Sequence, residues 1–405
     1  MKSIITLIAT LLFAFNSPAQ TSSANWNKFQ VKLAALEEKY NTYYPAKAYQ
    51  ETEVVLNDIL SALEHSDLSV AEQKEYASNI SMIKANVYYN LACIRSLRHQ
   101  KKQAIADFGK AIDWGYTGYQ HAKTDSDLDN IRTDKKFIAF LNRIKQYDML
   151  HILQQSGNYE KGRSDTLPAF VYQTADNHNL KEVRKYFNLD SIAGNGDEVS
   201  KLINLMLFVT RSIKYDGSNW ALCEFDAIDL YNYHKTTGKG INCRHKAMVL
   251  NEIYLAMGFK SRYVTCMPKD QDDPDCHVIN VVYSEKLKKW VWMDASHGIY
   301  VSDEHHNLLS IEEVRERLKN NLVLKLNKET GKTKEWYLDY YMAKNLYWIQ
   351  CTNLSQFNTE SRYRADEKDL QYIALTPVTY KQDNRYLNGN TITHDPAYFW
   401  QAPEK

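Results

Sequence analysis

From residue 26 to about residue 154 the apolar positions recur at three- and four-residue steps, and Gly and Pro are few. This repeat places the apolar side chains on one face of a helix, so the pattern predicts an all-α region. Residues 155–168 are polar and rich in helix breakers, which predicts an exposed connection. We therefore expect a helical domain over residues 20–154 and a linker over residues 155–168.

The pattern changes after the linker. An amphipathic helix is predicted over residues 197–213, where four apolar residues share one face: Leu202, Leu205, Met206 and Val209. Three runs rich in β-branched and aromatic residues follow at 259–267, 277–283 and 289–294, which predicts strands of an antiparallel meander. The predicted fold class is α+β. Residues 169–330 form its second domain, and residues 331–405 form a C-terminal helix and an irregular extension.

One predicted helix pair in the first region, at residues 87–97 and 102–112, resembles a tetratricopeptide unit. Small and large apolar residues stand at that repeat's spacing: Leu91, Ala92, Ala104, Phe108 and Ala111. Stacked repeats need at least about three units for stability. Predicted helices at 49–63 and 71–84 supply neighbours without clear signatures. The resemblance implies a helical-repeat-like domain able to bind a protein partner.

The candidate chemistry begins at Gly240, where a glycine-containing loop leads into a predicted helix. Asn242 is a good N-cap residue, which places Cys243 in the first helical turn. The positive end of the helix dipole lowers the pKa of a thiol at that position towards the range of a reactive thiolate. Behind Cys243 an apolar stripe predicts a helix buried on one side: Ala247, Leu250, Tyr254 and Met257.

The second and third predicted strands bring a histidine and an aspartate together. A tight turn centred on residues 285–286 pairs Val281 with Trp290 and places His277 opposite Asp294. Strand side chains alternate between faces, so this expectation requires a connection of even length. Cys243, His277 and Asp294 would then form a triad in which the imidazole takes the thiol proton and the carboxylate orients the imidazole.

The sequences around these three residues carry a family resemblance. NCRHKA, CHVINVVYS and KWVWMDAS resemble, in that order, the Cys, His and Asp motifs of the transglutaminase-like superfamily, over roughly residues 197–318. The resemblance implies a papain-like fold with the Cys helix packed on an antiparallel sheet. That family includes transglutaminases, peptide or amide hydrolases and catalytically silent proteins, so the fold transfers better than the substrate.

An oxyanion hole requires two donors. The backbone N–H of Cys243 is one candidate, and the resemblance implies a second donor upstream, for which Trp220 and Asn219 are the nearest pair. A tryptophan packed at a domain edge is an equal interpretation of Trp220.

Metal and cofactor chemistry are not expected. A structural zinc site requires four ligands, usually in close pairs, and no such pairing occurs around the triad. The six cysteines are too sparse for a disulfide scaffold, although Cys266 and Cys276 flank an acidic turn and a disulfide between them stays open. His245, His297, His305 and His306 need no role in the chemistry.

Composition limits the class of partner and the location. The net charge is +1 without long basic blocks, so no nucleic acid or anionic membrane partner is expected. Lys2, an apolar run at 4–15 and small residues before Gln20 predict a signal peptide over residues 1–19. We expect no integral membrane segment and an exported protein, either periplasmic or secreted.

Two functions compete at this point. The first is an exported enzyme, a cysteine-type peptidase or amidase or a protein-glutamine acyltransferase, which attacks a peptide or protein substrate through a thioester on Cys243. The second is a catalytically silent scaffold that binds a protein partner through its helical domain. The intact Cys–His–Asp set favours the enzyme.

Overall fold

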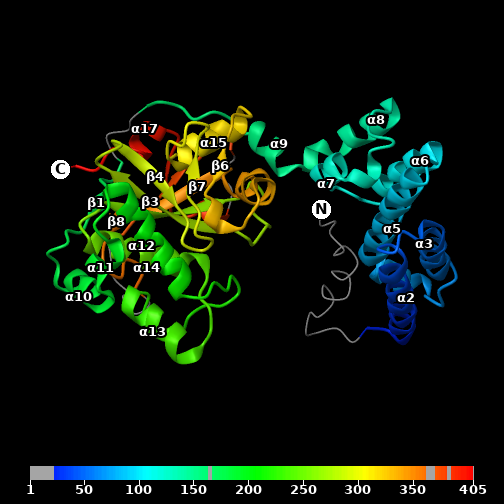
Figure 1. Ribbon diagram of the computed structural model, residues 1–405, viewed down its shortest axis with the longest axis horizontal. Coiled ribbons are helices and arrows are strands. Elements are labelled where there is room, and N and C mark those ends of the chain that lie inside the picture. The colour runs from blue at the N-terminus through cyan, green and yellow to red at the C-terminus, as the bar shows by residue number, and fades with distance from the viewer. Residues whose placement is uncertain (1–21, 163–166, 362–369, 381–384, 405) are drawn as a thin grey trace. The chain divides into compact units, whose positions relative to one another are not determined.

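The computed structural model describes residues 22–162, 167–361, 370–380 and 385–404 (Figure 1). The predicted signal peptide lies outside these residues. The chain divides into two compact units after Asp148. The first unit is helical and the second contains a mixed sheet covered by helices, which confirms the predicted α+β fold class. No helix in the described ranges has the length and apolar character that a membrane span requires.

The first unit is built from antiparallel helices joined by short connections. Its helices are α2 (Ala24–Tyr43), α3 (Tyr49–Glu64), α4 (Val70–Glu75), α5 (Ala77–Leu97), α6 (Lys101–Asp113), α7 (Tyr119–Thr124) and α8 (Lys135–Ile144). The predicted tetratricopeptide-like pair corresponds to the second half of α5 and to α6. Ala92, Ala104 and Ala111 are fully buried in the core of this pair, because small side chains let two helices approach closely.

The helix predicted over residues 71–84 is divided in the structure. Ser69 and Glu72 form a capping box that starts α4, and the helix ends at Glu75. Tyr76 then leaves helical geometry and its ring stacks on Trp26 of α2 at 4.3 Å between centroids. This packing against another helix divides a segment whose local pattern is continuously helical.

The second unit is organised around a six-stranded sheet in the order β10-β9-β7-β2-β3-β4. Its strands are β2 (Ser261–Met267), β3 (His277–Ser284), β4 (Lys289–Met293), β7 (Trp348–Thr352), β9 (Tyr372–Leu375) and β10 (Thr391–Thr393). β2, β3 and β4 form the predicted antiparallel meander. Short strands β1 (Val171–Tyr172) and β8 (Leu354–Ser355) pair with each other, as do β5 (Val301–Ser302) and β6 (Lys325–Leu326).

Helices cover both faces of this sheet. One face, with Tyr263, Val278 and Val282, packs against α14 (Cys243–Ala256) and the helices around it. Those helices are α10 (His178–Phe187), α11 (Leu189–Ala193), α12 (Glu198–Ser212) and α13 (Ala227–Thr237). The other face packs against α9 (Met149–Gln154), α15 (Ile311–Lys319), η4 (Glu335–Met342) and α17 (Pro396–Phe399). In Figure 1, α15 lies on the side of the sheet opposite α12 and α14.

The expected register of the β3–β4 hairpin is wrong by two residues. Val281 pairs with Trp292, and not with Trp290. The connection spans four residues, 285–288, and the backbone N–H of Leu287 donates to the Ser284 hydroxyl inside it at 3.0 Å. Sequence pattern alone did not distinguish this turn from a tighter one. The shift is an even number, so every side chain keeps the predicted face of the sheet.

Three strands from the described part of residues 331–405, namely β7, β9 and β10, lie within the sheet, beside the expected C-terminal helix and irregular extension. β7 pairs antiparallel with β2, and β9 and β10 continue the sheet beyond β7. α9 and the described part of the predicted linker belong to this unit as well: Val378 N–H donates to the Asn158 carbonyl at 3.1 Å, and Glu160 N–H donates to the His394 carbonyl at 2.9 Å.

We predict that Ile373→Ala in β9 destabilises the second unit by about 2–5 kcal/mol, because this side chain is fully buried in the core shared with β3 and β4. Val378→Ala is the matched control, since Val378 is 45% exposed. Urea denaturation gives the free energy of unfolding of each variant. Equal stabilities for the two variants would contradict a structural role for the C-terminal strands.

Candidate active site

Cys243 is the first residue of α14, and the chain before it is held on both sides. The Asn242 side chain caps the helix by accepting from His245 N–H at 3.0 Å. Ile241 forms a parallel bridge with Tyr215. A side chain at Gly240 would come within 2.9 Å of the Lys214 carbonyl oxygen, so this position accepts only glycine without movement of the chain. The predicted cap and the helix-terminal thiol are therefore present.

The rest of α14 anchors the thiol to the core. Ala247, Leu250 and Tyr254 of the predicted stripe are buried against the sheet and the neighbouring helices. Lys246 is also fully buried, and its ammonium group donates to the carbonyl oxygen of Ile213 at 2.7 Å. Burial lowers the pKa of Lys246 to about 8, partly opposed by the negative charge of Asp294. The buried ammonium group of Lys246 therefore ties α14 to Ile213 at the end of α12.

His277 and Asp294 are hydrogen-bonded, although they do not occupy directly opposed register positions. Nε2 of His277 lies 2.8 Å from Oδ2 of Asp294, and both side chains are fully buried. His277 is the first residue of β3, and Asp294 follows the last residue of β4. The two-residue register shift moves Asp294 off the position opposite His277, and the contact runs diagonally between the strands.

Four donors surround the Asp294 carboxylate. Oδ2 accepts from His277 and from the Tyr337 hydroxyl at 2.6 Å, while Oδ1 accepts from the backbone N–H groups of Ser296 at 2.7 Å and His297 at 3.3 Å. Burial by itself raises the pKa of Asp294, but the charges of His277 and His297 and the bonds from His277 and Tyr337 outweigh burial and lower it. Asp294 is therefore ionised at neutral pH.

Electrostatics favour a thiolate at Cys243. Burial raises the pKa of this thiol, but hydrogen bonding and charge from His277, the Val278 backbone N–H and the Arg244 charge outweigh it, so the pKa is lowered. Burial likewise opposes the imidazolium of His277, yet Asp294 and Cys243 raise its pKa. Among the described residues Nδ1 of His277 makes no hydrogen bond of ordinary geometry, although Cys243 and His277 shift each other's pKa; catalytic hydrogen bonds are often poorly aligned in resting active sites.

Arg244, the residue after Cys243, is held in place by a carboxylate. Its guanidinium lies 2.8 Å from an oxygen of Glu360, and it also donates to the Thr265 hydroxyl at 2.9 Å. The Tyr263 hydroxyl donates to the same glutamate at 3.0 Å. This network joins the first turn of α14 to β2 and to the chain after β8, and it fixes the positive charge that favours the thiolate.

Aromatic rings enclose the imidazole. The ring of His297 is stacked on His277 at 5.6 Å, and Tyr341 lies 5.1 Å from His277. Tyr215 and Trp336 contact the His297 ring edge to face at 5.3 and 5.7 Å. Sequence reasoning assigned no role to His297 and did not identify Tyr337. The only signal for the tyrosine was the aromatic richness of EWYLDYYM at residues 335–342.

The oxyanion candidates are placed close to the Cys helix. The Cys243 backbone N–H lies in the first turn, where helical N–H groups have no intrahelical acceptor. The Asn219 amide donates to the Gly240 carbonyl at 2.6 Å, so it holds the loop before the helix. Trp220 is 53% exposed and packs against Phe225. A second oxyanion donor at Trp220 or Asn219 stays a prediction.

His245 is a packing residue on the Cys helix. It is fully buried, its ring lies 4.7 Å from Trp220 and 4.7 Å from Phe225, and neither ring nitrogen has a partner among the described residues. Burial, with a smaller effect from the Arg244 charge, lowers its pKa to about 4. The neutral imidazole of His245, in the first turn of α14, is therefore enclosed by the rings of Trp220 and Phe225.

Within the described residues, two groups of side chains lie close enough together to hold a metal ion: His277, Asp294 and His297 in the second unit, and Cys93, Asp125 and Asp127 in the first. Hydrogen bonds explain both. Asp294 is filled by its four donors, and in the first unit Tyr89 donates to Asp125 at 2.8 Å while Tyr44 donates to Asp127. These groupings need no ion to account for them.

Cys93, Cys243, Cys266, Cys276 and Cys351 carry free thiols in the structure. Cys266 pairs in register with His277 and not with Cys276, so the hairpin does not place the two thiols opposite each other. Burial raises the pKa of Cys93, Cys266 and Cys351, and it raises that of Cys276 to about 11 with a contribution from Cys243. Of Cys93, Cys243, Cys266, Cys276 and Cys351, Cys243 alone has a lowered pKa.

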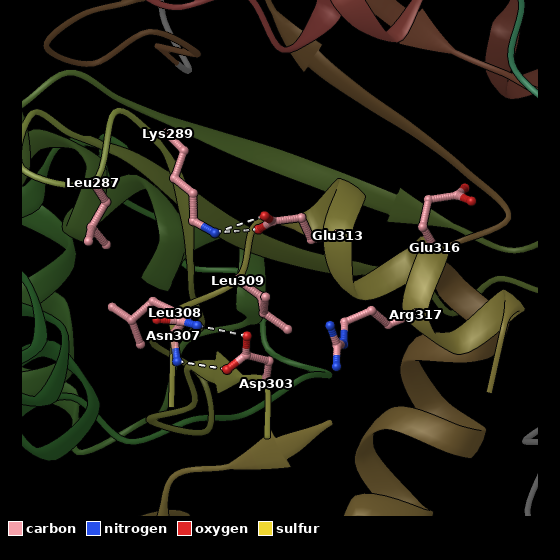
Figure 2. A pocket seen from close by; sticks show the side chains of 9 residues that line it. All are labelled: Leu287, Lys289, Asp303, Asn307, Leu308, Leu309, Glu313, Glu316 and Arg317. Carbon is pink, nitrogen blue, oxygen red and sulfur yellow. Dashed lines mark hydrogen bonds and ion pairs between the residues drawn. The ribbon is translucent and has the colours of Figure 1, made fainter. Parts of the chain in front are cut away.

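A separate pocket of about 470 Å³ lies beside α15 and contains no member of the triad (Figure 2). Its charged side chains are paired. Lys289 contacts both carboxylate oxygens of Glu313 at 2.8 and 2.7 Å, and Asp303 accepts from the Asn307 amide at 2.9 Å. We assign no chemistry to this pocket.

One comparison, with protein families, covers the segment that contains the site. Residues 186–295 match the family described as "Transglutaminase-like superfamily", so the second unit contains a transglutaminase-like domain that includes Cys243, His277 and Asp294. One solved structure, described as a "Putative Cysteine Protease" from Cytophaga hutchinsonii, is 14% identical with a TM-score of 0.24. It covers 41% of this chain, which spans 56% of its length, and a likeness this weak carries no argument. No curated protein matches the chain.

We predict that iodoacetamide at pH 7 modifies Cys243 faster than Cys93, Cys266, Cys276 or Cys351, because its lowered pKa gives the larger thiolate fraction. Timed alkylation followed by peptide mass mapping measures each site. Cys276 is the internal control, since it is partly exposed like Cys243 but has a raised pKa. Faster modification of Cys276 would show that accessibility, and not thiolate formation, governs the order.

Proposed function

We propose that this protein is a thiol-dependent amide or peptide hydrolase or acyltransferase that forms a thioester on Cys243. The observation that carries the proposal is the buried 2.8 Å contact between His277 and Asp294, beside a helix-terminal thiol whose pKa is lowered. Nucleophile, base and orienting carboxylate are the parts that acyl transfer to a thiol requires. The match of residues 186–295 to the transglutaminase-like superfamily supports the same chemistry.

In the first half of the proposed reaction the thiolate sulfur attacks the carbonyl carbon of a carboxamide. The carbon–nitrogen bond then breaks, His277 gives a proton to the departing amine or ammonia, and a thioester remains on Cys243. The Cys243 backbone N–H is positioned to stabilise the oxyanion that forms between these steps. Asp294 keeps the His277 proton on Nε2, which leaves Nδ1 to exchange a proton with the sulfur and the leaving group.

In the second half an acyl acceptor attacks the thioester carbon while His277 removes its proton, and the thiolate leaves. Water as acceptor gives a carboxylic acid, and a primary amine gives a new amide. Hydrolysis is the proposed default because Cys243 is only half-buried and transamidation requires a site that excludes water. The substrate we propose is a peptide or protein, and the helical unit is a proposed surface for a protein partner.

We predict that His277→Ala raises the apparent pKa of Cys243 and slows its alkylation by iodoacetamide at neutral pH. The imidazolium that stabilises the thiolate is lost, so the thiolate forms only at higher pH. The alkylation rate measured from about pH 5 to 9 gives the apparent pKa. His297→Ala is the comparison variant, because it removes an adjacent imidazole that makes no side-chain hydrogen bond to Asp294 and should change the profile less than His277→Ala does. Identical wild-type and His277→Ala profiles would favour the silent scaffold.

We predict that Cys243→Ala abolishes the covalent acyl-enzyme with an activated ester or glutamine-containing peptide, while Asp294→Ala retains the adduct at a reduced rate. Asp294→Ala keeps nucleophile and base but frees the imidazole, a loss that reaches about 10⁴ in related triads. Intact-mass spectrometry of the full chain detects the adduct, and release of ammonia or incorporation of a labelled amine separates the two acceptors. Cys276→Ala controls for attack by the neighbouring thiol, and an adduct that survives Cys243→Ala would refute the assignment.

A further inference from the structure

The helix η4 (Glu335–Met342) presents an aromatic face to the His277–Asp294 pair. It is a π-helix, a rare form in which hydrogen bonds run to the fifth residue and which occurs often at functional sites. This wider turn places Trp336 above Tyr341, and their rings are stacked at 5.4 Å with an interplanar angle of 8°. Tyr337 lies beside them, and its ring is 5.8 Å from His297.

Tyr337 is the member of this face that reaches the triad by hydrogen bond. Its side chain is fully buried, and its hydroxyl donates to Oδ2 of Asp294 at 2.6 Å. The same oxygen accepts from Nε2 of His277 at 2.8 Å, so the hydroxyl and the imidazole approach one carboxylate oxygen from two different segments. The other oxygen is held by the backbone N–H groups of Ser296 and His297.

We propose that Tyr337 is a positioning residue of the triad: its hydroxyl fixes the plane of the Asp294 carboxylate so that Oδ2 stays aligned with the imidazole of His277. This inference rests on the proposed function and adds to it a residue from beyond the matched segment 186–295. Backbone donors at Oδ1 restrain one end of the carboxylate, but they leave it free to turn about that end. The hydroxyl at Oδ2 removes this freedom without contacting the thiol or the substrate.

Other charged and titratable groups that face the pair do not substitute for this contact. They are Cys243 and Lys246 of α14, Cys266 of β2, Tyr215 after α12, His297 after Asp294, and Tyr341 of η4. Of the side chains in the described ranges, those of His277 and Tyr337 hydrogen-bond to Asp294. A change at Tyr337 therefore acts on the alignment of His277 through Asp294.

Tyr337→Phe in the full chain tests the proposal, because it removes the hydroxyl and keeps the ring that packs in the core. We expect the alkylation rate of Cys243 with iodoacetamide at pH 7 to fall roughly tenfold, and the acidic midpoint of its pH profile to move upward. A carboxylate that turns away from Nε2 holds the imidazolium less well, so the thiolate forms at higher pH. A profile that superimposes on that of the wild type, or a midpoint that moves downward, would overturn the proposal.

Tyr254→Phe is the matched control. Tyr254 is also fully buried in the second unit, and its hydroxyl donates to the Leu202 carbonyl at 2.8 Å, but it lies at the far end of the Cys helix from the thiol. This variant loses one buried hydrogen bond, as Tyr337→Phe does, and its pH profile should match the wild type. An equal shift in both variants would show a general effect of lost packing and would overturn the proposal.

A double-mutant cycle separates this inference from the proposed function. If Tyr337 acts through Asp294, then Tyr337→Phe has no further effect on the pH profile in an Asp294→Asn background. An additive shift in the double variant would overturn the positioning role. The proposed function fails separately, by an unchanged profile in His277→Ala. A profile that responds to His277→Ala but not to Tyr337→Phe leaves the proposed function in place and refutes the positioning role alone.

Discussion

The second unit depends on one buried charge. Transfer of an isolated carboxylate from water into the protein interior costs many kcal/mol, and natural proteins offset this cost with hydrogen bonds and partner charges. At Asp294 the compensation comes from the imidazole of β3, two N–H groups of the following turn and a hydroxyl of η4. The turn donors are adjacent to Asp294, but His277 and Tyr337 lie 17 and 43 residues away in sequence, so full stabilisation of the carboxylate requires the folded second unit.

The same charge organises the electrostatics of the thiol. Asp294 raises the pKa of His277 and so favours the imidazolium. The imidazolium in turn lowers the pKa of Cys243, which favours the thiolate. The N-terminal end of α14 and the guanidinium of Arg244 act in the same direction. The carboxylate of Asp294 is fully buried, whereas Cys243 is only partly buried, so the orienting group is kept dry at the edge of a less enclosed nucleophile residue.

The sequence predicts those features of the site that depend on neighbouring residues alone, such as the helix cap and the strands. Asn242 caps α14 because its side chain satisfies a free N–H group, which depends only on the adjacent residues. The strands of the meander were recognisable from their composition, and an even error in register left His277 and Asp294 on one face. Tyr337 could not be predicted. It contacts Asp294 across 43 residues, from a π-helix whose spacing matches neither the usual helical period nor that of a strand.

The matched segment, residues 186–295, contains only part of the sheet that supports the site. The match ends at residue 295, one residue after Asp294, yet β2 is a central strand whose second neighbour, β7, begins at Trp348. Without β7 the edge of β2 would present unpaired backbone groups, and without η4 the buried carboxylate would lose one of its two side-chain donors. Residues 186–295 therefore contain the three members of the triad but not all of the contacts that keep its carboxylate ionised and aligned. The structural unit that supports this chemistry extends into the C-terminal strands.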